Sequence, residues 1–207
     1  MPFAGRISIP AFGCLFSVKV WVNRFMRTVT YIALLRGINI GGHQVKMEHL
    51  RELFRELGLS SVRSYIQTGN VFFETTDSDR AALTHKIEQY LYKALGYEVP
   101  TFLRTISEVE NALQLDPFKH LEATPDTRFL ITFIPQPLPD DFKLPLVSPK
   151  NDFEIVQATS GEVFIVMRLV NGRPGNPAAF IEKTCKVKTT TRFFGTTAKI
   201  LQAAKGV

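Results

Sequence analysis

Two glycine-rich segments carry the side chains best suited to binding an anion. The first segment follows residue 35 and the second covers residues 67–70. The set combines basic and amide side chains with glycines, which leave the backbone N–H groups accessible. Its members are Arg36, Gly37, Asn39, Gly41, Gly42, Lys46, Gln67, Gly69 and Asn70. The first segment leads into a predicted helix, whose free N–H groups and dipole favour negative charge. The pattern predicts an anion site, although the same glycines could serve only tight turns and left-handed backbone.

A second set of polar residues lies near the C-terminus. Arg192, Thr196 and Lys199 follow a predicted strand and open the last predicted helix. A strand that leads into a helix N-terminus can bind an anion, and threonines there can also act as ordinary helix caps. The sequence leaves both interpretations open for this second ligand-binding set.

Motifs typical of enzymes are absent from the sequence. There is no HExxH, no GxSxG, no Walker loop and no Cys/His set at metal-binding spacing. The two cysteines, Cys14 and Cys185, are too far apart to form a CxxC pair, which favours a reducing compartment such as the cytoplasm. We therefore predict no metal and no cofactor, the catalytic residues, if any, stay unknown, and enzymatic activity stays an open alternative.

The elements that would position these residues follow two kinds of hydrophobic period. Strand-like runs cover residues 28–35, 62–66, 71–74 and 98–105, and helical periods cover residues 46–58 and a stretch capped by Asp77 or Ser78 and closed by Gly96. This order is β-α-β-β-α-β, the ferredoxin-like signature. In that topology the first two strands run parallel with the third between them. The two glycine segments should therefore lie side by side at one edge of the sheet.

The second half shows a similar order of elements. Strands are predicted at 127–134, 152–158, 162–170 and 188–193, with a helix starting at Asn176-Pro177 and a last helix over 196–204. Residues 135–149 contain five prolines, so any helix there would be short. We predict an α+β fold with two tandem ferredoxin-like modules, each an antiparallel sheet with helices on one face.

These patterns also predict the division of the chain. Residues 1–25 read as an N-terminal extension, residues 26–105 as the first module, 106–122 as a connecting helix and linker, and 123–207 as the second module with its C-terminal helix. The connecting helix begins at a capping box, Thr105 to Glu108, and Asp116-Pro117 ends it.

Charge is unevenly distributed along the 207 residues. The net charge is +6, but residues 1–47 carry no acidic residue and residues 168–207 carry only Glu182. Basic segments at both ends can attract phosphates or nucleic acid, or can simply be solvated surface. No apolar run reaches the roughly 18 residues of a membrane span, so we expect a cytoplasmic protein with no membrane partner.

Two motifs at this spacing resemble the DUF1697 family of proteins of unknown function. They are LLRGINIGG at 34–42 and SYIQTGNVFF at 64–73, and the resemblance runs from about residue 28 to residue 204. It implies paired ferredoxin-like modules in a cytosolic protein with no established activity. The family usually has Thr-x-Arg-Asn-Trp before the last helix, whereas this chain has Thr190-Thr191-Arg192-Phe193-Phe194.

Three functions remain compatible with these observations. The first is a binding module for a phosphate-bearing small molecule or nucleic acid, in which Phe72 or Phe73 would face the open side of the sheet and could stack on RNA bases. The second is an enzyme that acts on a small anionic or phosphorylated substrate held by Arg36 and Lys46. The third is a structural or oligomeric protein, such as a homodimer formed through its sheets.

Overall fold

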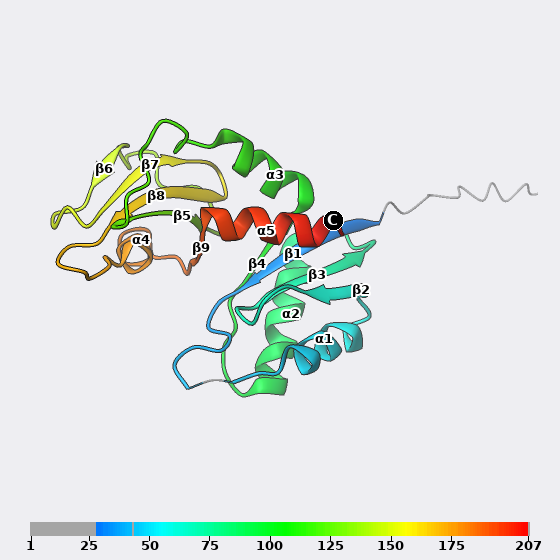
Figure 1. The fold of residues 1–207 in the computed structure, drawn as a ribbon. Coiled ribbons are helices and arrows are strands. Elements are labelled where there is room, and N and C mark those ends of the chain that lie inside the picture. The colour runs from blue at the N-terminus through cyan, green and yellow to red at the C-terminus, as the bar shows by residue number, and fades with distance from the viewer. Residues whose placement is uncertain (1–27, 43, 207) are drawn as a thin grey trace, which may run out of the picture.

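Residues 28–42 and 44–206 are described by the computed structural model, and they form two antiparallel sheets and five helices (Figure 1). This arrangement confirms the α+β class. The predicted extension, residues 1–25, lies outside the described residues. Within the described part of the chain, no helix is long and apolar enough to cross a membrane.

The first sheet has the strand order β2-β3-β1-β4. Its strands are β1 (Val29–Leu35), β2 (Ser60–Ser64), β3 (Asn70–Thr75) and β4 (Thr101–Thr105), and its connections include the helices α1 (Met47–Glu56) and α2 (Arg80–Leu95). Both β1 and β2 pair antiparallel with β3, so they run in the same direction. The loop after β1 and the turn before β3 therefore lie at the same edge, as expected from the sequence.

The start of α2 differs from the prediction by one or two residues. Asp79 is the N-cap, and its carboxylate accepts a hydrogen bond from the Ala82 N–H at 3.0 Å. Asp77, one of the two predicted caps, instead accepts from the Asp79 N–H at 3.0 Å and shapes the turn that precedes the helix. The predicted end at Gly96 is correct, because this residue adopts the left-handed conformation that closes the helix.

The second sheet has the order β6-β7-β8-β5-β9. Its strands are β5 (Thr127–Phe133), β6 (Leu146–Val147), β7 (Phe153–Ala158), β8 (Glu162–Arg168) and β9 (Thr190–Phe193). Helix α3 (Ile106–Leu115) leads into this half, α4 (Pro177–Cys185) connects β8 to β9, and α5 (Phe194–Lys205) follows β9. The strands β7-β8-β5-β9 repeat the order of the first sheet.

The second half does not have the predicted β-α-β-β-α-β order. No helix lies between β5 and β7 in the described structure; the two-residue strand β6 is the one regular element there. Five prolines over residues 135–149 explain this, since each lacks the N–H group that a helix interior requires.

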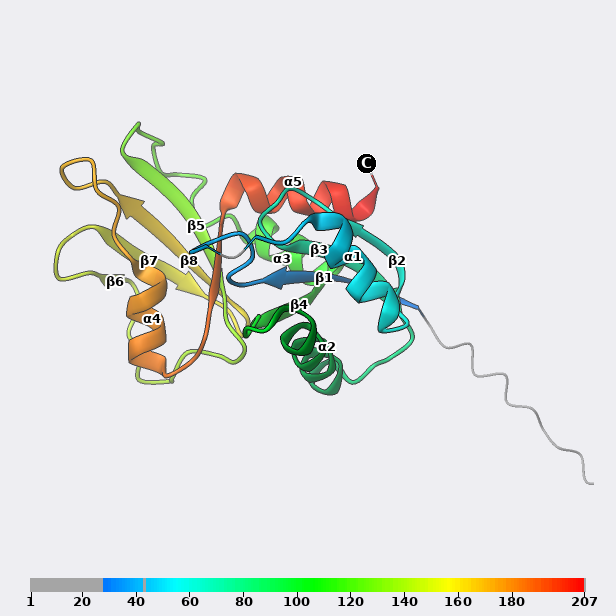
Figure 2. The ribbon, with the colours of Figure 1, turned by 90° about the horizontal axis from the view of Figure 1, so that it is seen from below.

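The prediction of helices on one face of each sheet is also wrong. In the first sheet, Tyr31 and Ala33 pack with α1 and α2, whereas Ile32 and Leu34 pack in a second core with α3, α5 and the second sheet. Figures 1 and 2 show α3 and α5 on the side of the first sheet that faces away from α1 and α2. Both sheets therefore share a core that these two helices help to fill.

This second core removes the aromatic platform expected for RNA. Phe72 and Phe73 point to opposite faces of the first sheet, and both are buried. Arg63 lies over the Phe72 ring, 5.7 Å from its centre, and its guanidinium donates to the carbonyls of Ala203 and Ala204 near the end of α5. Neither phenylalanine can stack on a nucleic-acid base in this fold.

Candidate functional site

Arg192 joins the two sets of residues that the sequence placed apart. It lies on β9, at the end of the second sheet next to the glycine segments. Its five N–H donors all reach oxygen atoms at 2.9 to 3.0 Å. The acceptors are the side chains of Asn70 and Thr190 and the backbone carbonyls of Leu35, Thr68 and Thr191. The turn before β3, the end of β1 and β9 therefore meet at Arg192.

The charge of Arg192 has no acidic partner among these acceptors. All five are neutral oxygens. Burial lowers the pKa of Arg192 to about 10, so the side chain stays cationic at neutral pH. Hydrogen bonds to neutral groups compensate only part of the lost hydration of a charge. The result is a positive charge, held in place by the backbone, whose field extends into the adjoining space.

That space is a cavity of about 510 Å³, which we call the Arg192 cleft. It lies between residues 35–40, residues 66–68, α4 and residues 189–196. Its volume falls within the range of about 300–1,000 Å³ that is typical of small-molecule sites. Arg36, Gly37 and Thr196 from the predicted sets line it together with Arg192.

Arg36 connects the first glycine segment to the second half of the chain. Its guanidinium forms an ion pair with Glu182 on α4, and its side chain is 40% exposed. Glu182 also accepts hydrogen bonds from the Thr189 backbone N–H at 2.8 Å and from the Thr189 hydroxyl at 3.0 Å. Glu182 therefore has two other donors besides Arg36.

Three other predicted residues border a neighbouring hollow of about 520 Å³ at the start of α1. Asn39, Lys46 and Gln67 line it. The Asn39 amide donates to the Gln67 carbonyl at 2.8 Å and accepts from the Val45 N–H at 2.7 Å, which fixes the first segment against the turn. Lys46 is also the N-cap of α1 and makes no side-chain cap, so the first helical N–H groups have no acceptor from an N-cap side chain.

The remaining predicted residues have different roles. Asn70 is fully buried and donates to the Tyr65 carbonyl and the Thr68 hydroxyl, so it supports Arg192 and does not reach the surface. Gly69 must be glycine, since its φ is +75° and a Cβ there would come within 3.0 Å of Ile38 and Leu35. Gly41 and Gly42 also have positive φ but face open space. Lys199 is exposed on α5 and does not line the cleft.

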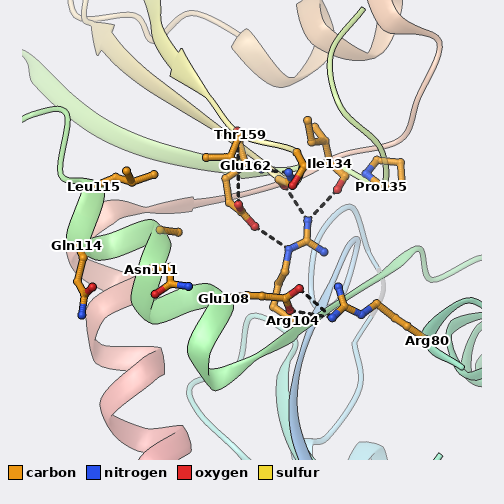
Figure 3. A pocket seen from close by; sticks show the side chains of 13 residues that line it. Arg80, Arg104, Glu108, Asn111, Gln114, Leu115, Ile134, Pro135, Thr159 and Glu162 are labelled. Atoms are coloured by element: carbon orange, nitrogen blue, oxygen red, sulfur yellow. Dashed lines mark hydrogen bonds and ion pairs between the residues drawn. The ribbon is translucent and has the colours of Figure 1, made fainter. Parts of the chain in front are cut away.

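A second cavity, of about 540 Å³, lies between α3, the start of α2 and the turn from β7 to β8; we call it the Arg104 cleft (Figure 3). Arg104 extends from β4 into this turn, where its Nε donates to Glu162 at 2.7 Å. Its Nη2 donates to the carbonyls of Ile134 at 2.8 Å and Gly161 at 2.7 Å. The Thr159 hydroxyl donates to the other Glu162 oxygen at 2.6 Å. This buried pair links the two halves of the chain.

The mouth of the Arg104 cleft holds another ion pair. Arg80 reaches Glu108 at 2.8 Å (Figure 3). The Thr105 N–H donates to the same carboxylate at 2.7 Å. Burial alone would raise the pKa of Glu108, but the hydrogen bonds from Thr105 and the charge of Arg80 outweigh it and lower that pKa. The capping box predicted from Thr105 and Glu108 is present.

Few signals in the sequence pointed to these partners. Glu182 could have been noticed as the single acid in the basic segment 168–207. Arg104 and Glu162 lie 58 positions apart on strands of different sheets, and no spacing rule connects them. In the described residues, no group of three or more His, Cys, Asp or Glu side chains is placed to hold a metal ion.

Comparison with known proteins agrees with the fold and the motifs. The family model described as "Protein of unknown function (DUF1697)" matches residues 28–164, so the chain belongs to this family. The matched range confirms the expected family, and residues 165–204 of the expected resemblance lie beyond it.

One solved structure is similar over most of the chain. It is a conserved bacterial protein from Streptococcus pneumoniae, with 24% identity and a TM-score of 0.61, and the match covers 86% of this chain and 99% of that chain. At this identity the likeness shows the fold alone. No curated protein matches the chain.

Proposed function

We propose that this protein is a binding module for a phosphate-bearing ligand, and that the ligand occupies the Arg192 cleft. The observation that supports this most strongly is the positive charge of Arg192, which is bonded to five neutral acceptors. A fixed charge without a carboxylate partner attracts an anion and needs no rearrangement to do so. The field of Arg192 draws the phosphate in, and Arg36 supplies the direct hydrogen bonds.

A small ligand suits this cleft better than a nucleic-acid strand. The sheet face expected to stack on RNA bases is buried beneath α3 and α5. The cleft is of small-molecule size, and the hollow at Lys46 offers room for a second phosphate group.

The proposal is tested by titrating the full chain with pyrophosphate in a calorimeter. We expect Arg36→Ala to weaken binding by about tenfold or more, since a charge-assisted hydrogen bond contributes roughly 1.5–3 kcal/mol. Arg168→Ala is the matched control, because Arg168 is 46% exposed and pairs with Glu154 much as Arg36 pairs with Glu182. Both variants lose one surface charge, so equal losses of affinity would indicate non-specific attraction and would contradict the proposal.

Competition with short single-stranded RNA distinguishes the two phosphate-bearing classes. Binding through several phosphates weakens steeply with ionic strength, whereas a single-phosphate site weakens less. We expect RNA to displace pyrophosphate poorly, with a shallow dependence on salt. Strong displacement with a steep dependence would favour nucleic acid.

The division of the chain is also a proposal. We infer structural units at 26–105 and 123–207, joined by 106–122. Both follow the element order β-α-β-β-α-β, except that residues 134–152 stand in place of the first helix in the second unit. The equal strand order of the two sheets supports this. The homodimer and the cytoplasmic location expected from the sequence stay predictions.

A further inference from the structure

Three large apolar side chains from separate segments are exposed around the Arg192 cleft. Ile40 is 67% exposed, Ile66 is 44% exposed and Phe193 is 51% exposed, and all three line the cavity. They come from the first glycine segment, the turn before β3 and the end of β9. Isolated exposed apolar residues are ordinary, but a group gathered around a concave site marks a binding surface.

The backbone of Ile66 is strained in the position that presents this side chain. Its φ is +49°, a left-handed conformation that a β-branched residue rarely adopts. The hydrogen bond from the Tyr65 N–H to the Asn70 carbonyl, at 3.0 Å, helps to hold this turn closed. Strain of this kind persists where the surrounding structure imposes it, and it gathers at functional sites.

The apolar group and the charge occupy different parts of one cavity. Arg192 and Arg36 supply the positive charge, while Ile40, Ile66 and Phe193 supply unpartnered apolar surface. Inorganic phosphate alone would leave that apolar surface in water, and a purely apolar ligand would leave the charge of Arg192 without a counter-ion. A ligand that satisfies both has a phosphate next to an apolar portion.

We infer that the ligand of the Arg192 cleft is an organic phosphate whose apolar or aromatic portion lies against Ile40, Ile66 and Phe193. This inference rests on the proposed function and names the ligand class. A nucleotide and a lipid-like alkyl phosphate share this chemistry. Phe193 favours a flat ring, because aromatic pairs stack with specific geometry.

The test compares 1-naphthyl phosphate with inorganic phosphate on the full chain. We expect naphthyl phosphate to bind the natural protein about tenfold or more tightly than phosphate, as burial of an aromatic ring adds affinity. Phe193→Ala should weaken naphthyl phosphate and leave phosphate binding unchanged. Tyr92→Ala is the matched control, since Tyr92 is a 55% exposed aromatic residue on α2 that does not line this cleft.

Ile66→Gly gives an independent readout. Glycine relieves the strain at positive φ, so this variant should melt at a higher temperature than the natural protein while binding naphthyl phosphate more weakly. A gain in stability without any loss of affinity would remove Ile66 from the site and contradict the inference.

The outcomes separate this inference from the proposed function. If phosphate and naphthyl phosphate bind equally and both depend on Arg36, the anion site stands and the inference about the apolar portion is overturned. If neither binds, both fall. The last comparison is between adenosine monophosphate and octyl phosphate. Tighter binding of adenosine monophosphate would identify the ligand as nucleotide-like, and tighter binding of octyl phosphate as lipid-like.

Discussion

The Arg104 cleft contains a buried arginine and the Arg192 cleft a partly buried one, and the two differ in what faces the charge. Arg104 meets Glu162 in a pair whose side chains are only 9% and 10% exposed. Arg192 meets only neutral oxygens. In the first arrangement the two charges balance each other, and the pair joins two halves of the chain. The second leaves a charge that an external anion can complement.

The surroundings of the two clefts differ in their apolar surface. Each cleft has an ion pair beside its arginine, Arg80 with Glu108 in the first and Arg36 with Glu182 in the second. The Arg192 cleft also carries exposed apolar side chains, Phe193 among them. We therefore propose a structural role for the Arg104 cleft and a binding role for the Arg192 cleft, although their volumes are similar.

Removal of Glu162 should have the largest effect on stability. Glu162→Ala leaves Arg104 buried without its carboxylate, which costs about 3–5 kcal/mol in the free energy of unfolding. Glu154→Ala, which breaks the exposed pair with Arg168, should cost no more than about 1 kcal/mol. Chemical denaturation measures both. A cost for Glu162→Ala as small as that of the control would show that the Arg104 pair is not a structural link.

Asn70→Ala, at the Arg192 cleft, should have an intermediate effect on the free energy of unfolding. The change leaves the Arg192 Nε–H without its acceptor at 2.9 Å and costs about 1–3 kcal/mol. Asn111→Ala, an exposed amide on α3 in the Arg104 cleft, should change the free energy of unfolding little. Equal melting temperatures for the two variants would mean that Asn70 does not position Arg192.

Glu108→Gln should have the smallest effect, and its sign depends on pH. Because the pKa of Glu108 is lower in the folded protein, its contribution to stability is full above the pKa of the unfolded chain and is lost as the pH falls through the folded value. Glutamine keeps the capping hydrogen bonds, so the variant should lose less than about 1 kcal/mol near pH 7 and show a weaker acid dependence. The measurement is the free energy of unfolding as a function of pH. If it fell at acidic pH as steeply for the variant as for the natural protein, this prediction would be contradicted.

The sequence predicted local structure well where local rules decide it. The capping box at Thr105, the proline start of α4 and the glycine end of α2 follow from neighbouring residues alone. The proximity of the two glycine segments also followed from the parallel direction of β1 and β2.

Features that depend on long-range packing escaped prediction. The burial of Phe72 requires α3 and α5 to cover the second face of the first sheet, and no local pattern specifies that contact. Asn70 looked like a surface donor because its turn composition is polar, yet it is buried beneath Arg192. Arg192 and the glycine segments appeared as separate sites, since the bond between Arg192 and Asn70 spans 122 positions.

The most direct test of the account is a two-dimensional ¹⁵N–¹H nuclear magnetic resonance titration of the full chain with 1-naphthyl phosphate. We predict saturable shifts of backbone amide signals in residues 36–42, 66–69 and 190–196, while amides of residues 108–114 and 159–162 around the Arg104 cleft stay unchanged. Shifts confined to the Arg104 cleft, or shifts spread over the basic surface without saturation, would contradict the claim that the unbalanced charge of Arg192 marks the binding site.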